Sequence, residues 1–187
     1  MVAQPYGALE DDLARRLAPW DTALGADRKA YVHHILRVLA IADLLFARTG
    51  AAGAPGSERE EFRTAAAFHD LGIWAAGTFD YLEPSCALAT EWLIAEGRED
   101  LTDPVCAMIR DHHRLRAAGG PAEAVELFRR ADSVDVTLGA RRFGLRYSAY
   151  SRLTERWPDA GFHARLVELT WRRALIHPLS PLPMLRW

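Results

Sequence analysis

The sequence has almost no lysine, few cysteines and little net charge, and each shortage argues against a class of function. Lys29 is the only lysine, so a lysine-based mechanism has almost no candidate residue. The two cysteines, Cys86 and Cys106, lack ligand-like spacing, which favours core thiols in a reducing compartment over a disulfide or a zinc site. A net charge of −2 at pH 7 argues against a nucleic-acid polymer or a membrane surface as partner.

The sequence also lacks β-alternating segments and, by inspection, apolar runs that approach membrane-spanning length. Its N-terminus does not show the charged-then-apolar order of a signal peptide, so we expect a cytoplasmic protein. With 187 residues, 50% of them apolar, the chain is long enough to bury a core in one domain, which we place at 1–187.

Apolar residues instead recur at helical spacing along most of the chain, and this pattern predicts an all-α fold. Helices are expected at about residues 9–17, 27–48, 58–70, 85–96, 104–113, 119–138, 147–156 and 161–177. The segment 72–84 should be a loop rich in aromatic and acidic residues. C-terminal helices occupy 145–187, where Trp171, Leu175 and Ile176 would lie in the core or on the surface of a homodimer.

The central expected helix carries two adjacent potential metal ligands at its end, His69 and Asp70. Ser57 and Glu60 form a capping-box pattern at its start, and Gly72 stands where a stop signal is expected. His69 continues the apolar face, where a lone histidine is more often a core residue with a hydrogen-bond partner. A buried carboxylate beside it is costly without a partner, and a cation is the usual one.

Other inward-facing ionisable residues could supply the remaining ligands. His34 lies on the apolar face of the first long helix. His112 and His113 end the helix expected at 104–113, and Asp132 interrupts the apolar stripe of the next helix. Each residue alone fits an ordinary buried polar group with its own partner. Several buried ionisable groups in one domain need a shared partner, so together they predict a metal site.

In this order, the residues resemble the H…HD…D signature of the HD-domain superfamily, over roughly residues 27–140. The resemblance implies an HD-domain-like helical bundle and a metal-dependent enzyme. Most members are phosphohydrolases acting on nucleotides, cyclic nucleotides or small phosphate esters. The same helical core also hosts cyanamide hydratase and mixed-valent diiron oxygenases, so the resemblance implies metal chemistry firmly and a substrate only weakly.

The resemblance implies four ligands of a first metal: His34, His69, Asp70 and Asp132. Mixed imidazole and carboxylate ligation suits Mn, Fe, Co, Ni or Zn, and the sequence does not choose among them. His112 and His113 match the histidine pair that some members use for a second metal. Such members usually carry a further histidine between the two motifs, and none occurs here between His69 and His112. A second metal therefore stays open, with Glu83 or water in that place.

The predicted chemistry is hydrolysis of a small-molecule phosphate ester or nucleotide by a metal-activated water. Asp70 or a nearby carboxylate would orient or deprotonate the water, and Glu83 is a further catalytic candidate. His112 or His113, whichever is not a metal ligand, would protonate the leaving group. The expected substrate-binding residues are Arg37, Trp74, Asp80, Tyr81, Arg114 and Asp135. Alternatives are an HD-type diiron oxygenase, a non-phosphate hydrolase of the hydratase or amide type on the same ligands, and a metal-binding module without activity.

Overall fold

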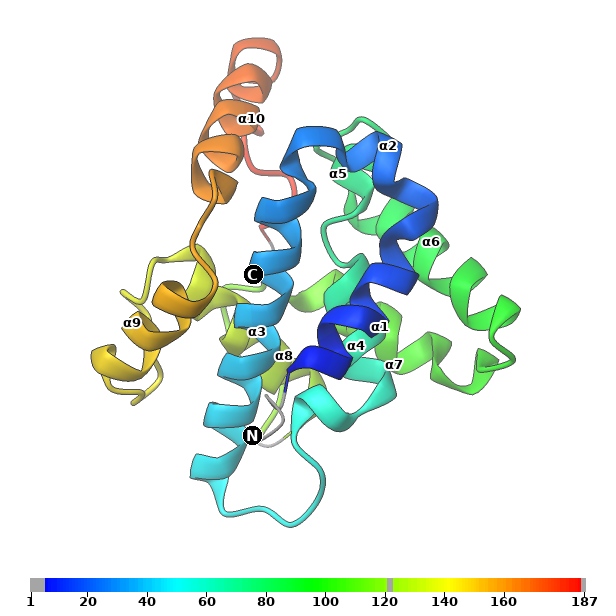
Figure 1. Ribbon diagram of the computed structural model, residues 1–187. Coiled ribbons are helices and arrows are strands. Elements are labelled where there is room, and N and C mark those ends of the chain that lie inside the picture. Colours follow the sequence, from blue (N-terminus) through cyan, green and yellow to red (C-terminus); the bar gives the residue numbers. More distant parts are fainter. Residues whose placement is uncertain (1–5, 121–122, 186–187) are drawn as a thin grey trace.

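The computed structural model describes residues 6–120 and 123–185 of the chain (Figure 1). Over these ranges it contains helices and no β-strand, which confirms the predicted all-α class. The α-helices are α1 (Gly7–Leu17), α2 (Asp21–Leu24), α3 (Arg28–Thr49), α4 (Glu60–Phe68), α5 (Gly72–Ala75), α6 (Leu82–Ala95), α7 (Thr102–Asp111), α8 (Ala124–Val136), α9 (Tyr147–Arg156) and α10 (Phe162–Ile176). Four 3-10 turns lie at Ala18–Trp20, Gly25–Asp27, Gly56–Glu58 and Glu99–Leu101.

Most predicted helices have counterparts in the structure, but α2 was not predicted, and α8 begins at Ala124 rather than at 119. Helix α9 has the predicted bounds, and α3 and α10 differ from theirs by one residue at each end. The expected loop at 72–84 is wrong in part, because it contains α5 and the first residues of α6. Pro121, expected to open the helix that became α8, lies outside the described residues.

Helix α3 is the central element of the bundle (Figure 1). It packs along α8 and against α4, while α7 packs against α4, α6 and α8. Large apolar side chains fill the core between these helices, among them Tyr31, Ile35, Phe62 and Phe128. Full burial of one such side chain contributes about 1.5–3 kcal/mol, so this packing is the main force that holds the helices together.

Part of the helical stretch Gly7–Thr49 is apolar enough to satisfy a composition test for a membrane span. An 18-residue window in it has a mean hydropathy of 1.5, so the expectation that no segment approaches this length is wrong. In the structure, 67% of that window is buried inside the protein. A core helix such as α3 passes the same test because it buries apolar residues on nearly all sides.

The capping box predicted for Ser57 and Glu60 does not form. Ser57 instead donates its backbone N–H and its hydroxyl to the Asp43 carboxylate, at 2.8 and 2.5 Å. Arg59 is in an extended conformation, and α4 begins at Glu60 with no side-chain cap. A tertiary partner 14 residues earlier in the chain therefore replaces the local cap.

Gly72 opens α5 rather than ending the preceding helix. A Cβ atom at this position would lie 2.7 Å from the Tyr81 carbonyl oxygen and 2.9 Å from Ser85 Oγ. The backbone N–H of Gly72 also donates to Ser85 Oγ at 3.0 Å. Glycine is needed here for close approach, which lets the start of α6 lie against the turn that follows Asp70.

Helix α10 extends away from the rest of the bundle and carries several exposed apolar residues (Figure 1). Trp171, Leu175 and Ile176 are exposed by 66%, 68% and 73%. The expectation that they lie in the core is therefore wrong, and the dimer surface stays a prediction.

Candidate metal centre

The predicted ligands come from four parts of the bundle and meet in its interior. His34 lies in α3 and Asp132 in α8, His69 and Asp70 follow α4, and His112 follows α7. All five side chains are buried, with at most 2% of the residue exposed. Packing of α3, α4, α7 and α8 around one core brings these distant positions together.

The nitrogen and oxygen atoms of the first ligand set point at one small region. Nε2 of His34 lies 3.0 Å from Nε2 of His69. Oδ1 of Asp132 lies 3.5 Å from His34 Nε2 and 3.7 Å from His69 Nε2. Oδ2 of Asp70 lies 3.4 Å from His69 Nε2 and 3.9 Å from His34 Nε2. The four predicted residues are therefore within reach of one cation.

The two histidine rings direct their Nε2 atoms at each other. His34 Nδ1 donates to Asp135 Oδ2 at 2.8 Å, and His69 Nδ1 donates to the Ala66 carbonyl oxygen at 2.8 Å. Burial lowers the pKa of His69 to about 3, so that ring is neutral. A neutral imidazole has one N–H, so the Nε2 atom of His69, whose Nδ1 carries the hydrogen, is an acceptor. Two nitrogens bound at about 2.1 Å and at right angles to one cation would lie about 3 Å apart, as these do.

The carboxylates of the centre also lack partners. Oδ1 of Asp70 and both carboxylate oxygens of Asp132 are buried and have no hydrogen bond within the part of the chain that the structure describes. Burial, together with the charges of Asp70 and Asp135, raises the pKa of Asp132 to about 6. Buried, unbonded carboxylate oxygens are costly, and a divalent cation satisfies them and the histidine lone pairs together. The donor set fits a metal.

A second group of potential ligands adjoins the first and shares Asp70. Asp70, His112 and His113 offer ligand atoms within 4.8 Å of one another. His112 Nε2 lies 3.4 Å from Asp70 Oδ1, and His113 Nδ1 lies 3.6 Å from Asp132 Oδ2. Tyr81 donates its hydroxyl to His113 Nε2 at 2.9 Å and lies 3.5 Å from His112 Nε2. The tyrosine thus lies beside the histidine pair.

Comparison with known families agrees with this geometry. The family model described as HD domain matches residues 31–137, close to the predicted range of 27–140. The chain belongs to the HD-domain family. No curated protein and no solved structure matches the chain. Membership of the family therefore accounts for the helical bundle and the kind of metal site. The site formed by His34, His69, Asp70 and Asp132 is called the HD centre below, and finer conclusions about it come from the residues around it.

Arg37 and Asp135 form a hydrogen-bonded pair that contacts the ligand histidine His34. Asp135 accepts two hydrogen bonds from Arg37, at 2.7 and 2.8 Å, and one from His34 Nδ1. Burial opposes ionisation, but the bonds from His34 and Arg37 lower the pKa of Asp135 to about 2. Both residues were predicted to bind substrate, and the structure buries them and bonds them to each other. This geometry favours a positioning role, in which Asp135 fixes the tautomer and orientation of a ligand histidine.

The structure does not bring Glu83 into the HD centre. Its carboxylate pairs with Arg110 at 2.8 Å, and its side chain is 61% exposed. It belongs to neither group of potential ligands among the described residues. The sequence left Glu83 open as a ligand of a second metal beside His112 and His113. In the structure, the Tyr81 hydroxyl lies beside this histidine pair instead. Tyr81 was predicted to contact substrate, and the sequence held no signal for its bond to His113.

The other predicted substrate-binding residues are held by partners around the HD centre. Trp74 Nε1 donates to Asp27 at 2.9 Å. Arg114 lies 3.7 Å from Asp111. Asp80 pairs with Arg173 of α10 at 2.8 Å and lines a cavity near Tyr81, described next. The structure brings Asp80 and Tyr81 together, and it places Trp74 and Arg114 in separate contacts.

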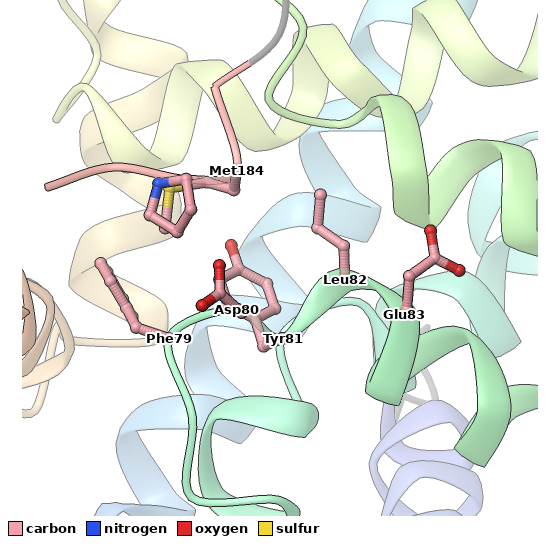
Figure 2. A pocket seen from close by; sticks show the side chains of 7 residues that line it. Phe79, Asp80, Tyr81, Leu82, Glu83 and Met184 are labelled. Carbon is pink, nitrogen blue, oxygen red and sulfur yellow. The ribbon is translucent and has the colours of Figure 1, made fainter. Parts of the chain in front are cut away.

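A small cavity of about 120 Å³ adjoins Tyr81 (Figure 2). Residues 79–83 line it from one side, and Pro183 and Met184 from the C-terminal segment line it from the other. Met184 is buried against Tyr81 and Leu82. The sequence did not predict that this segment covers Tyr81, because nothing local indicates which part of the bundle a chain end will contact.

Proposed function

We propose that the protein is a metal-dependent phosphohydrolase that acts on a small phosphate ester or nucleotide. The observation that carries the proposal is the convergence of two buried imidazoles and two buried carboxylates in an HD-domain bundle. HD-domain proteins are generally metal-dependent phosphohydrolases. A divalent cation held there supplies an acidified water and positive charge for a phosphoryl oxygen.

Tyr81 and His113 are the residues that we expect to meet the leaving group. Burial and the charges of Asp70 and Asp132 raise the pKa of Tyr81, so it keeps its proton. Burial and the charge of His112 lower the pKa of His113, so this ring is neutral and accepts the tyrosine hydrogen bond. The pair can hold a proton at the Tyr81 oxygen for a leaving-group oxygen on the cavity side.

The two roles predicted for His112 exclude each other. Its Nδ1 donates to the Ile109 carbonyl oxygen at 2.6 Å. Only Nε2 is therefore available, and it can bind a metal or carry a proton for the leaving group, not both. Counting metals per chain consequently decides which role His112 has.

The size of the cavity supports a small substrate. Its volume of about 120 Å³ holds a phosphoryl group or a similarly small fragment. Pockets that enclose drug-sized ligands usually measure about 300–1,000 Å³. With Pro183 and Met184 of the C-terminal segment lining the cavity, its volume favours a small phosphate ester over a larger nucleotide derivative or a polymer.

Phosphate release tests the proposal directly. The protein, stripped of metal and reloaded with Mn, Co or Ni, is incubated with a panel of nucleotides and small phosphate esters. We expect metal-dependent release of inorganic phosphate from at least one compound, and its loss in Asp70→Asn. Absence of release from the whole panel in a protein shown to hold metal would contradict the proposal.

The diiron oxygenase stays a second candidate because both ligand groups share Asp70. A carboxylate between two adjacent groups is the arrangement needed to bridge a pair of metals. Anaerobic purification followed by metal analysis separates the two functions. Two irons per chain and an oxygen-dependent reaction would favour the oxygenase and reject the phosphohydrolase.

A further inference from the structure

The two cysteines of the chain face each other on neighbouring helices. Cys86 lies in α6 and Cys106 in α7, and these helices pack together. Each Sγ atom lies 3.8 Å from the backbone carbonyl oxygen of the other cysteine. Both thiols are free, and the residues are 3% and 5% exposed. This reciprocal contact places the two side chains side by side, away from the ligands of the HD centre.

The surroundings make the two thiols chemically unequal. Hydrogen bonds from the Cys86 thiol and from the Thr90 hydroxyl lower the pKa of Cys106 to about 6. The Thr90 oxygen lies 3.7 Å from Cys106 Sγ. The contact with Cys106 and burial raise the pKa of Cys86. Arg110 favours the Cys106 thiolate and Glu83 opposes it. The sulfur of Cys106 lies beside the Thr90 hydroxyl, so we assign Cys106 as the nucleophile and Cys86 as the thiol that resolves the intermediate.

A cavity gives small molecules a way to the pair. It has a volume of about 440 Å³ and is lined by both cysteines, Thr90 and Arg110, together with acidic residues of α6 and α7. This volume admits a molecule as small as hydrogen peroxide. This cavity is lined by α6 and α7 and adjoins the cavity at Tyr81, because Glu83 lines both.

We propose that Cys86 and Cys106 form a peroxide-reactive thiol pair that closes to a disulfide. The Cys106 thiolate attacks one oxygen of hydrogen peroxide, so that an S–O bond forms, the O–O bond breaks, and the departing hydroxide takes up a proton as water. The Cys86 sulfur, having given up its proton, then attacks Cys106 Sγ. The S–S bond forms, the S–O bond breaks, and a second water leaves. The two thiols lose two electrons and the peroxide gains them.

The disulfide would link the two helices next to the HD centre. Tyr81 immediately precedes α6, and His112 immediately follows α7. A covalent bond between α6 and α7 fixes their separation and restricts the unfolded chain, so the oxidised protein should unfold at a higher temperature than the reduced one.

Peptide mapping of the full-length protein tests the proposal. Trypsin cleaves after arginine, which puts Cys86 in the peptide 64–98 and Cys106 in the peptide 99–110. After treatment with hydrogen peroxide and digestion without reductant, we expect these two peptides to be joined, with the mass of two hydrogens missing. Dithiothreitol should separate them again. Recovery of both peptides with free thiols, or of cross-links between two chains only, would overturn the proposal.

Two serine variants test the order of the reaction. In Cys86→Ser, Cys106 should be oxidised and accumulate as a sulfenic acid that dimedone traps. In Cys106→Ser, oxidation of Cys86 should be at least tenfold slower than thiol loss in the unchanged protein. Equal rates in the two variants would overturn the assignment of Cys106 as nucleophile, and the peptide mapping of the unchanged protein does not depend on either variant folding.

Discussion

The Nε2 atoms of His34 and His69 face each other 3.0 Å apart, although each ring already donates its Nδ1 hydrogen to another residue. The His69 ring is neutral and has no hydrogen on Nε2, so its lone pair is free to bind a cation placed between the two rings. Both carboxylate oxygens of Asp132 and Oδ1 of Asp70 have no hydrogen bond among the described residues. The buried site between His34, His69, Asp70 and Asp132 is therefore suited to bind a cation.

Asp135→Asn should weaken metal binding about 10- to 100-fold, because Asp135 orients His34 and increases its basicity. Competition with a fluorescent chelator measures the affinity. Asp43→Asn is a control, because Asp43 is also a hydrogen-bonded carboxylate, although only partly buried, and it bonds to Ser57 instead of a ligand histidine. The control should lose some stability and keep its metal affinity. An unchanged affinity in Asp135→Asn would show that the positioning role is wrong.

Tyr81→Phe should lower kcat on the order of 100-fold while metal content stays the same. The substitution removes the hydroxyl that bonds to His113 and leaves the ring that packs beside the cavity. Steady-state kinetics and metal analysis on the same preparation measure both quantities. Tyr150→Phe on α9 is the matched control and should keep normal kcat. A loss of metal in Tyr81→Phe would instead make the tyrosine part of the metal site.

The metal ligands could be predicted from the sequence because their positions break helical patterns. His34, His69 and Asp132 each fall on an apolar face, and such a position is visible in any single helix. The order of the motifs then indicated the family. The structure confirms the helical class, and it places these residues with Asp70 in one buried group.

Contacts between distant residues could not be predicted in the same way. Ser57 looked like a helix cap and bonds instead to the carboxylate of Asp43 in α3, which tertiary packing brings beside it. Asp135 pairs with Arg37, 98 residues away in the sequence, so both looked like free polar groups. Each side chain has several partners available in principle, and only tertiary packing selects one.

Gly72→Ala should destabilise the protein by about 1–3 kcal/mol, because its Cβ would meet the Tyr81 carbonyl oxygen at 2.7 Å. The Tyr81 carbonyl oxygen belongs to the backbone and cannot rotate away from the new Cβ atom as a side chain could. Helix α5 or α6 therefore has to move. Urea denaturation measures the change in the free energy of unfolding. Gly7→Ala in α1 is the control, since its Cβ would meet nothing within 4 Å, and it should leave stability equal or slightly higher. Equal effects of the two substitutions would refute the role of close approach at Gly72.

Glu126 gives the fold a stabilising contribution that depends on pH. Its carboxylate accepts hydrogen bonds from Arg129, Arg130 and the backbone N–H of Ala118. Burial opposes ionisation, but these bonds lower its pKa to about 2, from an ordinary value of 4.5. Because the folded pKa is the lower one, the contribution is complete above pH 4.5 and is lost as the pH falls toward 2.

Glu126→Gln should therefore lower the free energy of unfolding by roughly 3 kcal/mol at pH 7. The difference from the unchanged protein should shrink as the pH falls below 4.5 and vanish near pH 2. Urea denaturation of both proteins at pH 7, 5 and 3 measures it. A difference that stays constant over this range would mean that the carboxylate charge does not stabilise the fold.

Anomalous diffraction from a crystal prepared with Mn or Co tests most directly whether four distant side chains share one cation. We expect an anomalous peak about 2.0–2.2 Å from Nε2 of His34, from Nε2 of His69 and from one carboxylate oxygen each of Asp70 and Asp132. A peak elsewhere in the chain, or no peak at this position in a crystal that contains the metal, would contradict it.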